Sequence, residues 1–190
     1  RWMHTNGGTP DDLRAVATST RAWAQRNPHA VVRAPLDSDG YYASPMISEP
    51  LRRLDCARPV NGAVAVVITA DPGVGTGPRV AIRGAGREHP VRHRRAGRES
   101  WFGGGARAVE DALTEAGMTR DDLDTAQLYD PFSIVTLMLL EEYGLTRGVR
   151  AGDFVRSGET GLGGVLPTNT GGGQLSGFYL QGMTPLSSAP

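Results

Sequence analysis

The 190-residue sequence predicts an α/β fold, and three observations carry this prediction. Residues 63–69 form a nearly continuous run of β-branched and small apolar residues, which is typical of a strand buried on both faces. Residues 79–84 alternate between polar and apolar side chains, as a half-buried strand does. Segments with helical caps and helical periodicity lie before and after these two strands. Strands and helices in alternation favour a layered α/β architecture with right-handed crossovers.

The first helix is expected from Thr9 to about Arg26. Thr9 suits the N-cap position, Pro10 suits the first turn, and the two aspartates that follow lie where the helix dipole favours negative charge. Asn27 and Pro28 then end the helix. Its buried stripe is predicted to consist of Leu13, Val16, Ala17, Thr20 and Trp23 or Ala24.

The next stretch, up to Pro50, is rich in proline and lacks periodicity, so we expect a long ordered loop there. In the second half, a helix is predicted over Ser100–Ala116, with Gly117 as its C-cap residue. A short helical turn starts at Thr119, and a brief strand is expected over Ala126–Tyr129. The residues of the 100–116 helix expected to face the core are Val109, Ala112, Leu113 and Ala116.

Another helix should follow the brief strand directly. Asp130 suits its N-cap, Pro131 suits its first position, and Gly144 ends it. Because this helix is apolar almost all round, we expect it to be buried. Tyr129 therefore lies at a strand-to-helix turn, where a helix N-terminus stabilises an anion or a phenolate.

A glycine-rich run over residues 161–185 is the most unusual stretch of the chain. Positive φ angles and close backbone approach are the uses of glycine, so Asn169 and Gly171, Gly172 and Gly173 predict a tight turn. A turn that exposes successive N–H groups can cradle an anion or an oxyanion. The alternative is a glycine-rich surface turn between a strand and a helix.

This run resembles the C-terminal active-site loop of the thiolase superfamily, in the branch of the sterol-carrier thiolases. That loop reads Asn-x-x-Gly-Gly, then four residues, then Gly-His-Pro-x-Gly. Tyr179 stands where the family has its histidine, between Phe178 in place of glycine and Leu180 in place of proline. A phenol of pKa about 10 cannot activate a cysteine as an imidazole of about 6.5 does. The matching positions are Asn169, Gly172, Gly173 and Gly182.

The segment Tyr129-Asp-Pro-Phe132 resembles the second thiolase loop, which reads Asn-Glu-Ala-Phe, or His-Asp-Cys-Phe in the sterol-carrier branch. Tyr129 takes the place of the asparagine or histidine that holds a catalytic water or the thioester oxygen. We expect Tyr129 to act as base and Tyr179 as acid, although these two roles are interchangeable at the level of sequence. The alternative for Tyr129 is a packed aromatic residue whose hydroxyl is capped.

Cys56 is the single cysteine, so the chain contains neither an internal disulfide nor a cysteine zinc site. It lies in Leu-Asp-Cys ahead of Asn61-Gly-Ala, which resembles the sterol-carrier pattern Leu-Asp-Cys followed by Ser-Asp-Gly-Ala, and there the cysteine is structural. His89 and His93 have helical spacing, but the arginines around them would repel a cation, so no metal is expected. This basic stretch is either a solvated loop or a loop that touches substrate phosphates.

Together with Pro59-Val-Asn-Gly-Ala63, the two loops resemble the thiolase-like steroid side-chain-cleaving aldolases of actinobacteria, in the lipid-transfer-protein branch. The resemblance covers nearly all of the chain. It implies a layered α-β-α-β-α thiolase fold, incomplete in a chain of this length. It also implies retro-aldol cleavage of a β-hydroxyacyl-CoA steroid to a ketone or aldehyde plus a short acyl-CoA. The implied catalytic pair is Tyr129 and Tyr179, and the implied oxyanion or substrate-binding residues are Asn169, Gly171, Gly172, Gly173, Asp130 and Phe178.

Further expectations follow from the resemblance and from composition. The resemblance implies a coenzyme A thioester as substrate with no separate cofactor, a homodimer, and a small OB-fold partner subunit. Residues 1–70 would close the N-terminal thiolase half, residues 71–78 would be a linker, and residues 79–190 would begin the C-terminal half. The net charge of zero gives no electrostatic case for nucleic acid or an anionic membrane, and no apolar run reaches the length of a membrane span. We therefore expect a cytoplasmic protein.

Two other functions stay open at this point. An acetyl-CoA acyltransferase, that is a thiolase of lipid or sterol degradation, would carry its nucleophilic cysteine outside this chain. A non-catalytic carrier of acyl-CoA or lipid would tolerate the loss of both tyrosine hydroxyls, because it has no turnover to lose.

Overall fold

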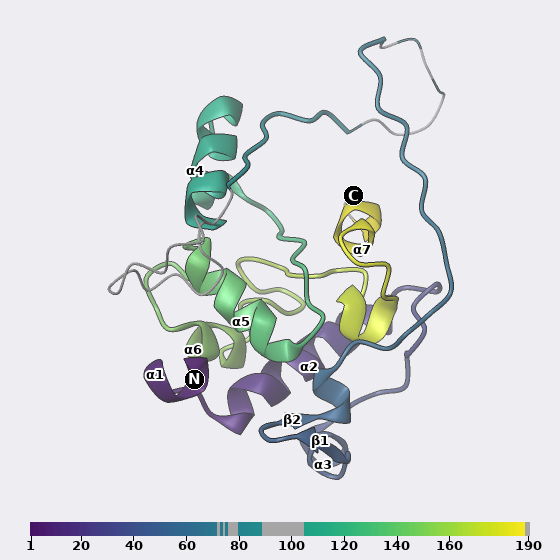
Figure 1. The fold of residues 1–190 in the computed structure, drawn as a ribbon, viewed down its shortest axis with the longest axis vertical. Coiled ribbons are helices and arrows are strands. Elements are labelled where there is room, and N and C mark those ends of the chain that lie inside the picture. Colours follow the sequence, from purple (N-terminus) through teal and green to yellow (C-terminus); the bar gives the residue numbers. More distant parts are fainter. Residues whose placement is uncertain (72, 74, 76–79, 89–104, 189–190) are drawn as a thin grey trace.

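The computed structural model describes residues 1–71, 73, 75, 80–88 and 105–188. Figure 1 shows a body of packed helices, from which a long extended segment runs out after η1 and returns toward α4. The N-terminal elements are α1 (Trp2–Thr5), α2 (Pro10–Ala24), α3 (Ser38–Tyr42), β1 (Met46–Ser48), β2 (Leu51–Arg52) and the 3₁₀ turn η1 (Arg53–Asp55). The later ones are α4 (Gly105–Ala116), the 3₁₀ turn η2 (Arg120–Asp122), α5 (Ser133–Glu142), α6 (Ala151–Arg156), the π-helical turn η3 (Gly173–Gly177) and α7 (Met183–Ser188).

Helix α2 is the central element of the body, where it packs against α5, α6 and η3. It begins as predicted, with Thr9 at the N-cap and the Thr9 backbone N–H donating to Asp12 Oδ2 at 2.9 Å. The predicted stripe is buried, with Ala24 as the last member and Trp23 only half-buried. Asp12 is also fully buried and forms ion pairs with Arg150 at 2.8 Å and with an arginine of α6. A paired carboxylate is what allows a charge at this position in the core.

Helix α5 lies beside α2 and supplies much of the core, with Leu137 and Leu140 both fully buried. It begins at Ser133 and has Phe132 in an extended N-cap conformation, so the prediction that Asp130 caps it and Pro131 opens it is wrong. The Asp130 carboxyl is instead directed into the interior. The end of the helix is as predicted, because Gly144 follows it with a φ of 67°.

Helix α4 packs against α5 and ends where the sequence predicts. Gly117 has a φ of 66°, and the Met118 N–H donates to the Leu113 carbonyl at 2.9 Å, as in a left-handed C-terminal cap. Of the four residues expected to face the core, only Leu113 is buried, and the other three are half-buried. Residues 100–104 of the predicted helix lie outside the described residues.

The predicted loop up to Pro50 contains structure that the sequence interpretation missed. Helix α3 starts where the Asp37 side chain accepts a hydrogen bond from the Gly40 N–H at 2.7 Å. Strands β1 and β2 then pair in antiparallel orientation. Helix α3 places Tyr41 in the core at 1% exposure, so this part of the loop prediction is wrong.

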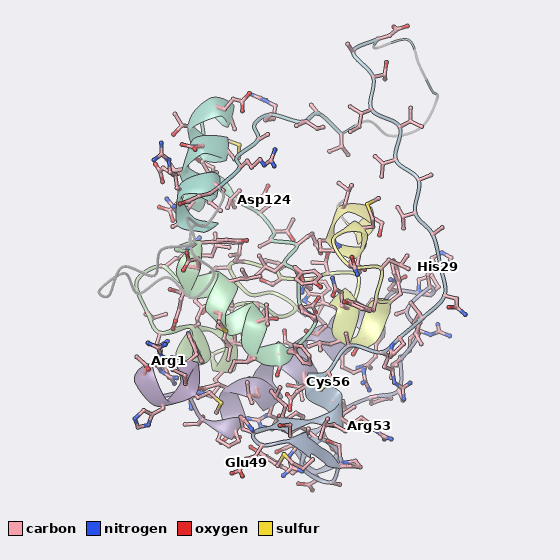
Figure 2. The ribbon with its side chains drawn as sticks, viewed as in Figure 1. Arg1, His29, Glu49, Arg53, Cys56 and Asp124 are labelled. Atoms are coloured by element: carbon pink, nitrogen blue, oxygen red, sulfur yellow. The ribbon has the colours of Figure 1, made fainter. Side chains whose placement is uncertain are left out.

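The two strands predicted at 63–69 and 79–84 do not form in the described part of the chain. Residues 63–69 are extended but unpaired, and Val67 and Ile68 are 81% and 73% exposed. Ile82, in the second predicted strand, is 69% exposed. In Figure 2, side chains of residues 63–69 project from the extended chain away from the packed helices. A strand buried on both faces needs neighbouring strands, and the described residues supply none here.

Other expectations about the chain have mixed outcomes. The brief strand predicted over Ala126–Tyr129 is extended, with a single bridge from Ala126 to Thr168. The helical turn after Thr119 forms as η2. Most of the predicted linker over 71–78 lies outside the described residues. Within the described ranges, no helix combines the length and apolarity that crossing a bilayer requires.

Candidate active site

Two loops that are distant in sequence are fixed side by side at the candidate site. The parallel bridge between Ala126 and Thr168 joins them, with the Ala126 N–H donating to the Pro167 carbonyl at 3.0 Å and the Asn169 N–H donating to the Ala126 carbonyl at 2.9 Å. Beyond the bridge, the chain from Ala126 continues extended, so its side chains alternate in direction. Ala126, Leu128 and Asp130 are buried, whereas Tyr129 is 38% exposed.

Tyr129 and Tyr179 meet across the two loops. Their hydroxyl oxygens are 3.2 Å apart, and either hydroxyl could donate the hydrogen bond. A parallel bridge to Pro59 holds the backbone at Tyr179, which is itself half-buried. The structure thus brings together the two tyrosines that the sequence analysis selects, and it leaves the Tyr129 ring partly accessible.

The pKa of Tyr129 is raised above its ordinary value, first by the hydrogen bond to Tyr179 and then by partial desolvation. This direction is opposite to the one expected from a helix N-terminus beside the ring. The physical reason is that α5 begins four residues after Tyr129 rather than directly after it. The dipole of a helix acts mainly within its first turn. Tyr129 is therefore a neutral phenol at neutral pH.

The glycine-rich turn has the backbone geometry that its sequence predicts. Asn169, Gly172 and Gly173 all have positive φ, at 53°, 96° and 55°. The Gly172 N–H donates to the Asn169 carbonyl at 2.8 Å, and the Gly171 carbonyl accepts from Asn27 Nδ2 at 2.8 Å. The turn leads into the π-helical η3, a type of element that is common at functional sites.

Asn169 and Asp130 each attach one loop to the other. Asn169 is 2% exposed, and its Oδ1 accepts a hydrogen bond from the Leu128 N–H at 2.6 Å. The Asp130 carboxyl is fully buried, and its Oδ1 accepts from the Gln174 N–H at 2.8 Å. Gly173 leaves space for that carboxyl, because a Cβ at this position would lie 2.1 Å from Asp130 Oδ2.

Burial raises the pKa of Asp130 to about 7, and the Gln174 backbone N–H and the Asn169 side chain oppose the shift. No hydrogen bond of good geometry joins Asp130 Oδ2 to Asn169 Nδ2, and in the described part of the chain both atoms are buried without a partner. Asp130 does not face the solvent at the tyrosine pair, unlike Tyr129. Phe178 is half-buried next to Tyr179, and its N–H donates to the Gly173 carbonyl at 3.2 Å.

Thr184 is a residue of the site that the sequence analysis missed. Its hydroxyl donates to the Phe178 carbonyl at 2.9 Å and accepts from the Leu180 N–H at 2.9 Å, so it holds the backbone on both sides of Tyr179. Thr184 is 1% exposed. A threonine hydroxyl near the start of a short helix commonly bonds to neighbouring backbone, and this was the available signal.

A second missed residue is Asp55, which anchors the start of α5. Its fully buried carboxylate accepts hydrogen bonds from Tyr41 Oη at 2.8 Å, from Ser133 Oγ at 2.6 Å and from the Arg52 N–H at 2.7 Å. Ser133 is the first residue of α5, so this network fixes the end of the loop that carries Tyr129.

Cys56 occupies a structural position, in agreement with its interpretation from sequence. It is half-buried near the beginning of α5 (Figure 2), where it forms an antiparallel bridge with Phe132, and its Sγ donates to the Arg52 carbonyl at 3.5 Å. Burial, and to a smaller extent Asp55, raises the pKa of its thiol. A raised pKa makes a thiol a poor nucleophile at neutral pH.

His89 and His93 are outside the described residues, and within the described ranges no three His, Cys, Asp or Glu side chains are grouped so that they could hold a metal ion. A cavity of about 210 Å³ is lined by Arg120, Arg147 and neighbouring residues and includes none of the predicted site residues. We place the candidate site at the tyrosine pair because that is where the chemistry-bearing groups converge.

Comparison with known proteins identifies the class. A family model for thiolase C-terminal domain-like proteins matches residues 86–186, which is more than half of the chain. The chain belongs to this family, and its thiolase fold class agrees with the one predicted from sequence.

Among curated relatives, the chain is 34% identical to a 17-hydroxy-3-oxo-4-pregnene-20-carboxyl-CoA lyase of Mycobacterium tuberculosis, over 98% of this chain and 50% of that protein. It is 30% identical to a steroid side-chain-cleaving aldolase of Thermomonospora curvata, over 100% of this chain and 50% of the relative. A solved structure of an Ltp2-ChsH2(DUF35) aldolase superposes with a TM-score of 0.78 at 27% identity, over 98% of this chain and 51% of that one. The chain therefore spans about half the length of these relatives.

Proposed function

We propose that the protein is a thiolase-like aldolase that cleaves a carbon–carbon bond of a β-hydroxyacyl-CoA by a retro-aldol reaction. The observation that carries this proposal is the 3.2 Å contact between the Tyr129 and Tyr179 hydroxyls on two converging loops. Two relatives are named as a lyase of a steroid acyl-CoA and as a steroid side-chain-cleaving aldolase, which supports a steroid acyl chain as the substrate.

The proposed reaction needs only proton transfers and stabilisation of an enolate. One tyrosine accepts the proton of the β-hydroxyl while its own phenolic proton moves along the hydrogen bond to the other tyrosine. The Cα–Cβ bond breaks, and its electron pair moves into the thioester as an enolate. The β-carbon leaves as a ketone or aldehyde. The other tyrosine returns a proton to the α-carbon and gives the shortened acyl-CoA. The turn is proposed to stabilise the enolate oxygen through the backbone at Gly171, which is half-buried, because Asn169, Gly172 and Gly173 are themselves buried and serve to shape the turn.

The raised pKa of Tyr129 bears on the assignment of roles. A phenol that shares its proton with a second phenol can pass a proton on without either residue being a free phenolate in the resting state. The pair is therefore proposed to act as a unit, in which Tyr129 and Tyr179 are interchangeable as base and acid. Phe132, which is 41% exposed, and half-buried Phe178 are proposed to form an apolar rim for the substrate.

The wider assembly is also proposed on the basis of the relatives. The structural neighbour is an aldolase whose name joins two proteins, Ltp2 and ChsH2, which supports a partner subunit for the complete protein. A homodimeric core, an OB-fold in that partner, a cytoplasmic location and the division at residues 71–78 stay predictions.

An acyltransferase is the second candidate function. It is supported by two relatives, which are named as a benzoylsuccinyl-CoA thiolase subunit of Thauera aromatica and an acetyl-CoA acetyltransferase of Methanothermobacter thermautotrophicus.

The test is removal of each hydroxyl in the complete enzyme with its partner. Tyr129→Phe and Tyr179→Phe keep the rings and are expected to reduce cleavage about a hundredfold, the usual effect of losing a positioned acid or base. Binding of the CoA ester, measured by calorimetry, should stay within a factor of about two because a ring alone fills the same space. Tyr42→Phe is the matched control, since Tyr42 is 37% exposed and bonds to Asp11 away from the site.

The outcomes separate the candidate functions. Near-normal cleavage by the double Phe variant would refute the aldolase assignment. A trapped acyl-enzyme, seen as a mass increase on a cysteine, would favour the acyltransferase. Tight binding of the CoA ester with no turnover by the wild-type complex would favour the carrier.

A further inference from the structure

The two loops of the site are held together by a reciprocal exchange of side chains. Asn169, on the glycine-rich loop, accepts from the backbone of Leu128 on the tyrosine loop. Asp130, on the tyrosine loop, accepts from the backbone of Gln174 on the glycine-rich loop. Asp130 follows Tyr129 directly, so any movement at this second attachment moves the Tyr129 ring.

The attachment through Asp130 also reaches Tyr179. Gln174 lies in η3, whose first residue Gly173 receives the Phe178 N–H on its carbonyl at 3.2 Å. Gln174 also donates from Nε2 to the Gln181 carbonyl at 2.7 Å. These two contacts tie η3 to residues on both sides of Tyr179. The position of η3 against the Asp130 carboxyl therefore sets the spacing of the two phenols.

The surroundings of the Asp130 carboxyl allow one arrangement when it is ionised and another when it is protonated. Oδ1 is bonded to Gln174, whereas Oδ2 is buried without a partner beside Gly173, and Asn169 Nδ2 is a buried donor that also lacks a partner among the described residues. An ionised carboxyl has acceptor capacity for both donors, and hydrogen bonds to a charged acceptor are shorter and stronger than neutral ones. A protonated carboxyl offers Oδ2 as a donor and binds the turn less tightly.

We propose that Asp130 is a positioning residue, and that ionisation of its carboxyl draws the Gly173–Gln174 turn against the tyrosine loop and so fixes the spacing of Tyr129 and Tyr179. The inference rests on the proposed aldolase function. The Asp130 carboxyl is fully buried, so in this proposal Asp130 does not contact the substrate. It acts instead by holding the two tyrosines in position.

The same geometry makes the effect depend on pH in the neutral range. Burial raises the pKa of Asp130 to about 7, so both forms of the carboxyl are populated there. Other titratable groups on the elements packed around it have their own partners. Arg21 of α2 donates to Ser176 Oγ at 2.9 Å, and Asp55 of η1 accepts from Tyr41 and Ser133. Burial, and to a smaller extent the charge of the exposed Arg58, lowers the pKa of Arg21. The hydroxyls of Tyr129 and Tyr179 form a hydrogen bond with each other.

The experiment compares rate profiles of the complete enzyme with its partner, from about pH 5.5 to about pH 8.5, for wild type, Asp130→Asn and Asp122→Asn. In the wild type, kcat should rise about tenfold through a midpoint near the pKa of Asp130 while KM stays flat, because a misplaced acid–base pair slows chemistry more than binding. Asp130→Asn keeps an acceptor for Gln174 and should remove the step, leaving kcat flat. Asp122, an exposed carboxylate bonded to Thr119, is the control and should leave the step intact.

A second measurement does not depend on turnover. The amide proton of Gln174, which donates to the carboxyl, should shift in NMR spectra with the same midpoint in the wild type and stay constant in Asp130→Asn. A pH step that survives in Asp130→Asn, or a Gln174 amide that does not titrate, would overturn the inference. If instead both Phe variants cleave normally while the Gln174 amide still titrates, the aldolase function has failed and the coupling of Asp130 to the turn has not.

Discussion

Thr184 holds the residue before and the residue after Tyr179 with one hydroxyl. Valine has almost the same shape but cannot make either hydrogen bond, so Thr184→Val should release the Tyr179 backbone without leaving a cavity. Loss of these buried contacts should lower stability by about 1–3 kcal/mol. Cleavage by the complete enzyme should fall about tenfold, mainly in kcat, because the phenol loses its fixed position.

Two comparisons make the Thr184 prediction specific. Thr184→Ser retains the oxygen and should restore most of the rate, which a purely packing role of the methyl group would not allow. Thr114→Val, on the exposed face of α4, should leave the rate unchanged. Equal rates in Thr184→Val and wild type would show that Tyr179 is held by other contacts.

Cys56 should be unreactive in the folded protein. Burial raises the pKa of its thiol and Asp55 adds to the shift, so little thiolate exists at neutral pH. In the complete enzyme, mass spectrometry after iodoacetamide treatment at neutral pH should show the Cys56 peptide modified at least about tenfold more slowly than in the same protein unfolded in urea. Rapid alkylation of Cys56 with parallel loss of cleavage would contradict its structural assignment.

The turn into η3 requires glycine at position 173 for two separate reasons. Its φ of 55° is unfavourable for other residues, and an added Cβ would lie 2.1 Å from Asp130 Oδ2. Gly173→Ala should therefore lower stability by about 2–4 kcal/mol and should separate the two loops. Gly163→Ala is a matched control with a φ of 82° and open space around the new Cβ, so it carries only the backbone strain of about 1 kcal/mol.

Thermal unfolding of the two alanine variants, with cleavage assays beside it, tests this prediction. Gly173→Ala should lose at least about ten times more activity than Gly163→Ala, because only the first contacts the Asp130 attachment. Equal losses would mean that the carboxyl moves aside readily and that the packing of Gly173 against it has no role in the site.

Helices were predictable from this sequence because their signals are local. Thr9 and Pro10 open α2 and Gly144 follows α5, as the capping rules require. The start of α5 was misjudged because the Asp130 carboxyl is used by the distant Gln174 N–H instead of by the helix. Helix α3 was missed because it is short and not periodic, although Asp37 with Gly40 three residues later was a usable cap signal.

The site was predictable in part. The resemblance to thiolase loops selected Tyr129 and Tyr179, and the structure brings their hydroxyls together. Periodicity and capping alone could not have paired them, because the residues are 50 positions apart and their contact depends on the Ala126–Thr168 bridge. Asp55 was missed for the same reason, since its partners Tyr41 and Ser133 lie on other elements. Thr184 was missed although its partners are only four and six residues away.

At the scale of the whole molecule, the extended segment is the feature that the described residues do not account for. Its apolar side chains are those of a buried strand, yet Val67 is 81% and Val80 is 72% exposed. The chain spans about half the length of the relatives it matches. We infer that this segment forms its strands only with neighbouring strands that the described residues do not supply.

This inference predicts how the 190-residue chain behaves alone. Unpaired apolar strands are templates for association, so the isolated chain should sediment as dimers or larger species at micromolar concentration and should unfold over a broad range. Val67→Lys together with Ile82→Lys should raise the monomer fraction, because lysine on an edge opposes strand pairing. Val149→Lys, exposed to 51% outside the segment, should leave association unchanged. A wild-type chain that is monomeric and unfolds in one cooperative transition would contradict the inference, because its apolar segment would then need no strand from elsewhere.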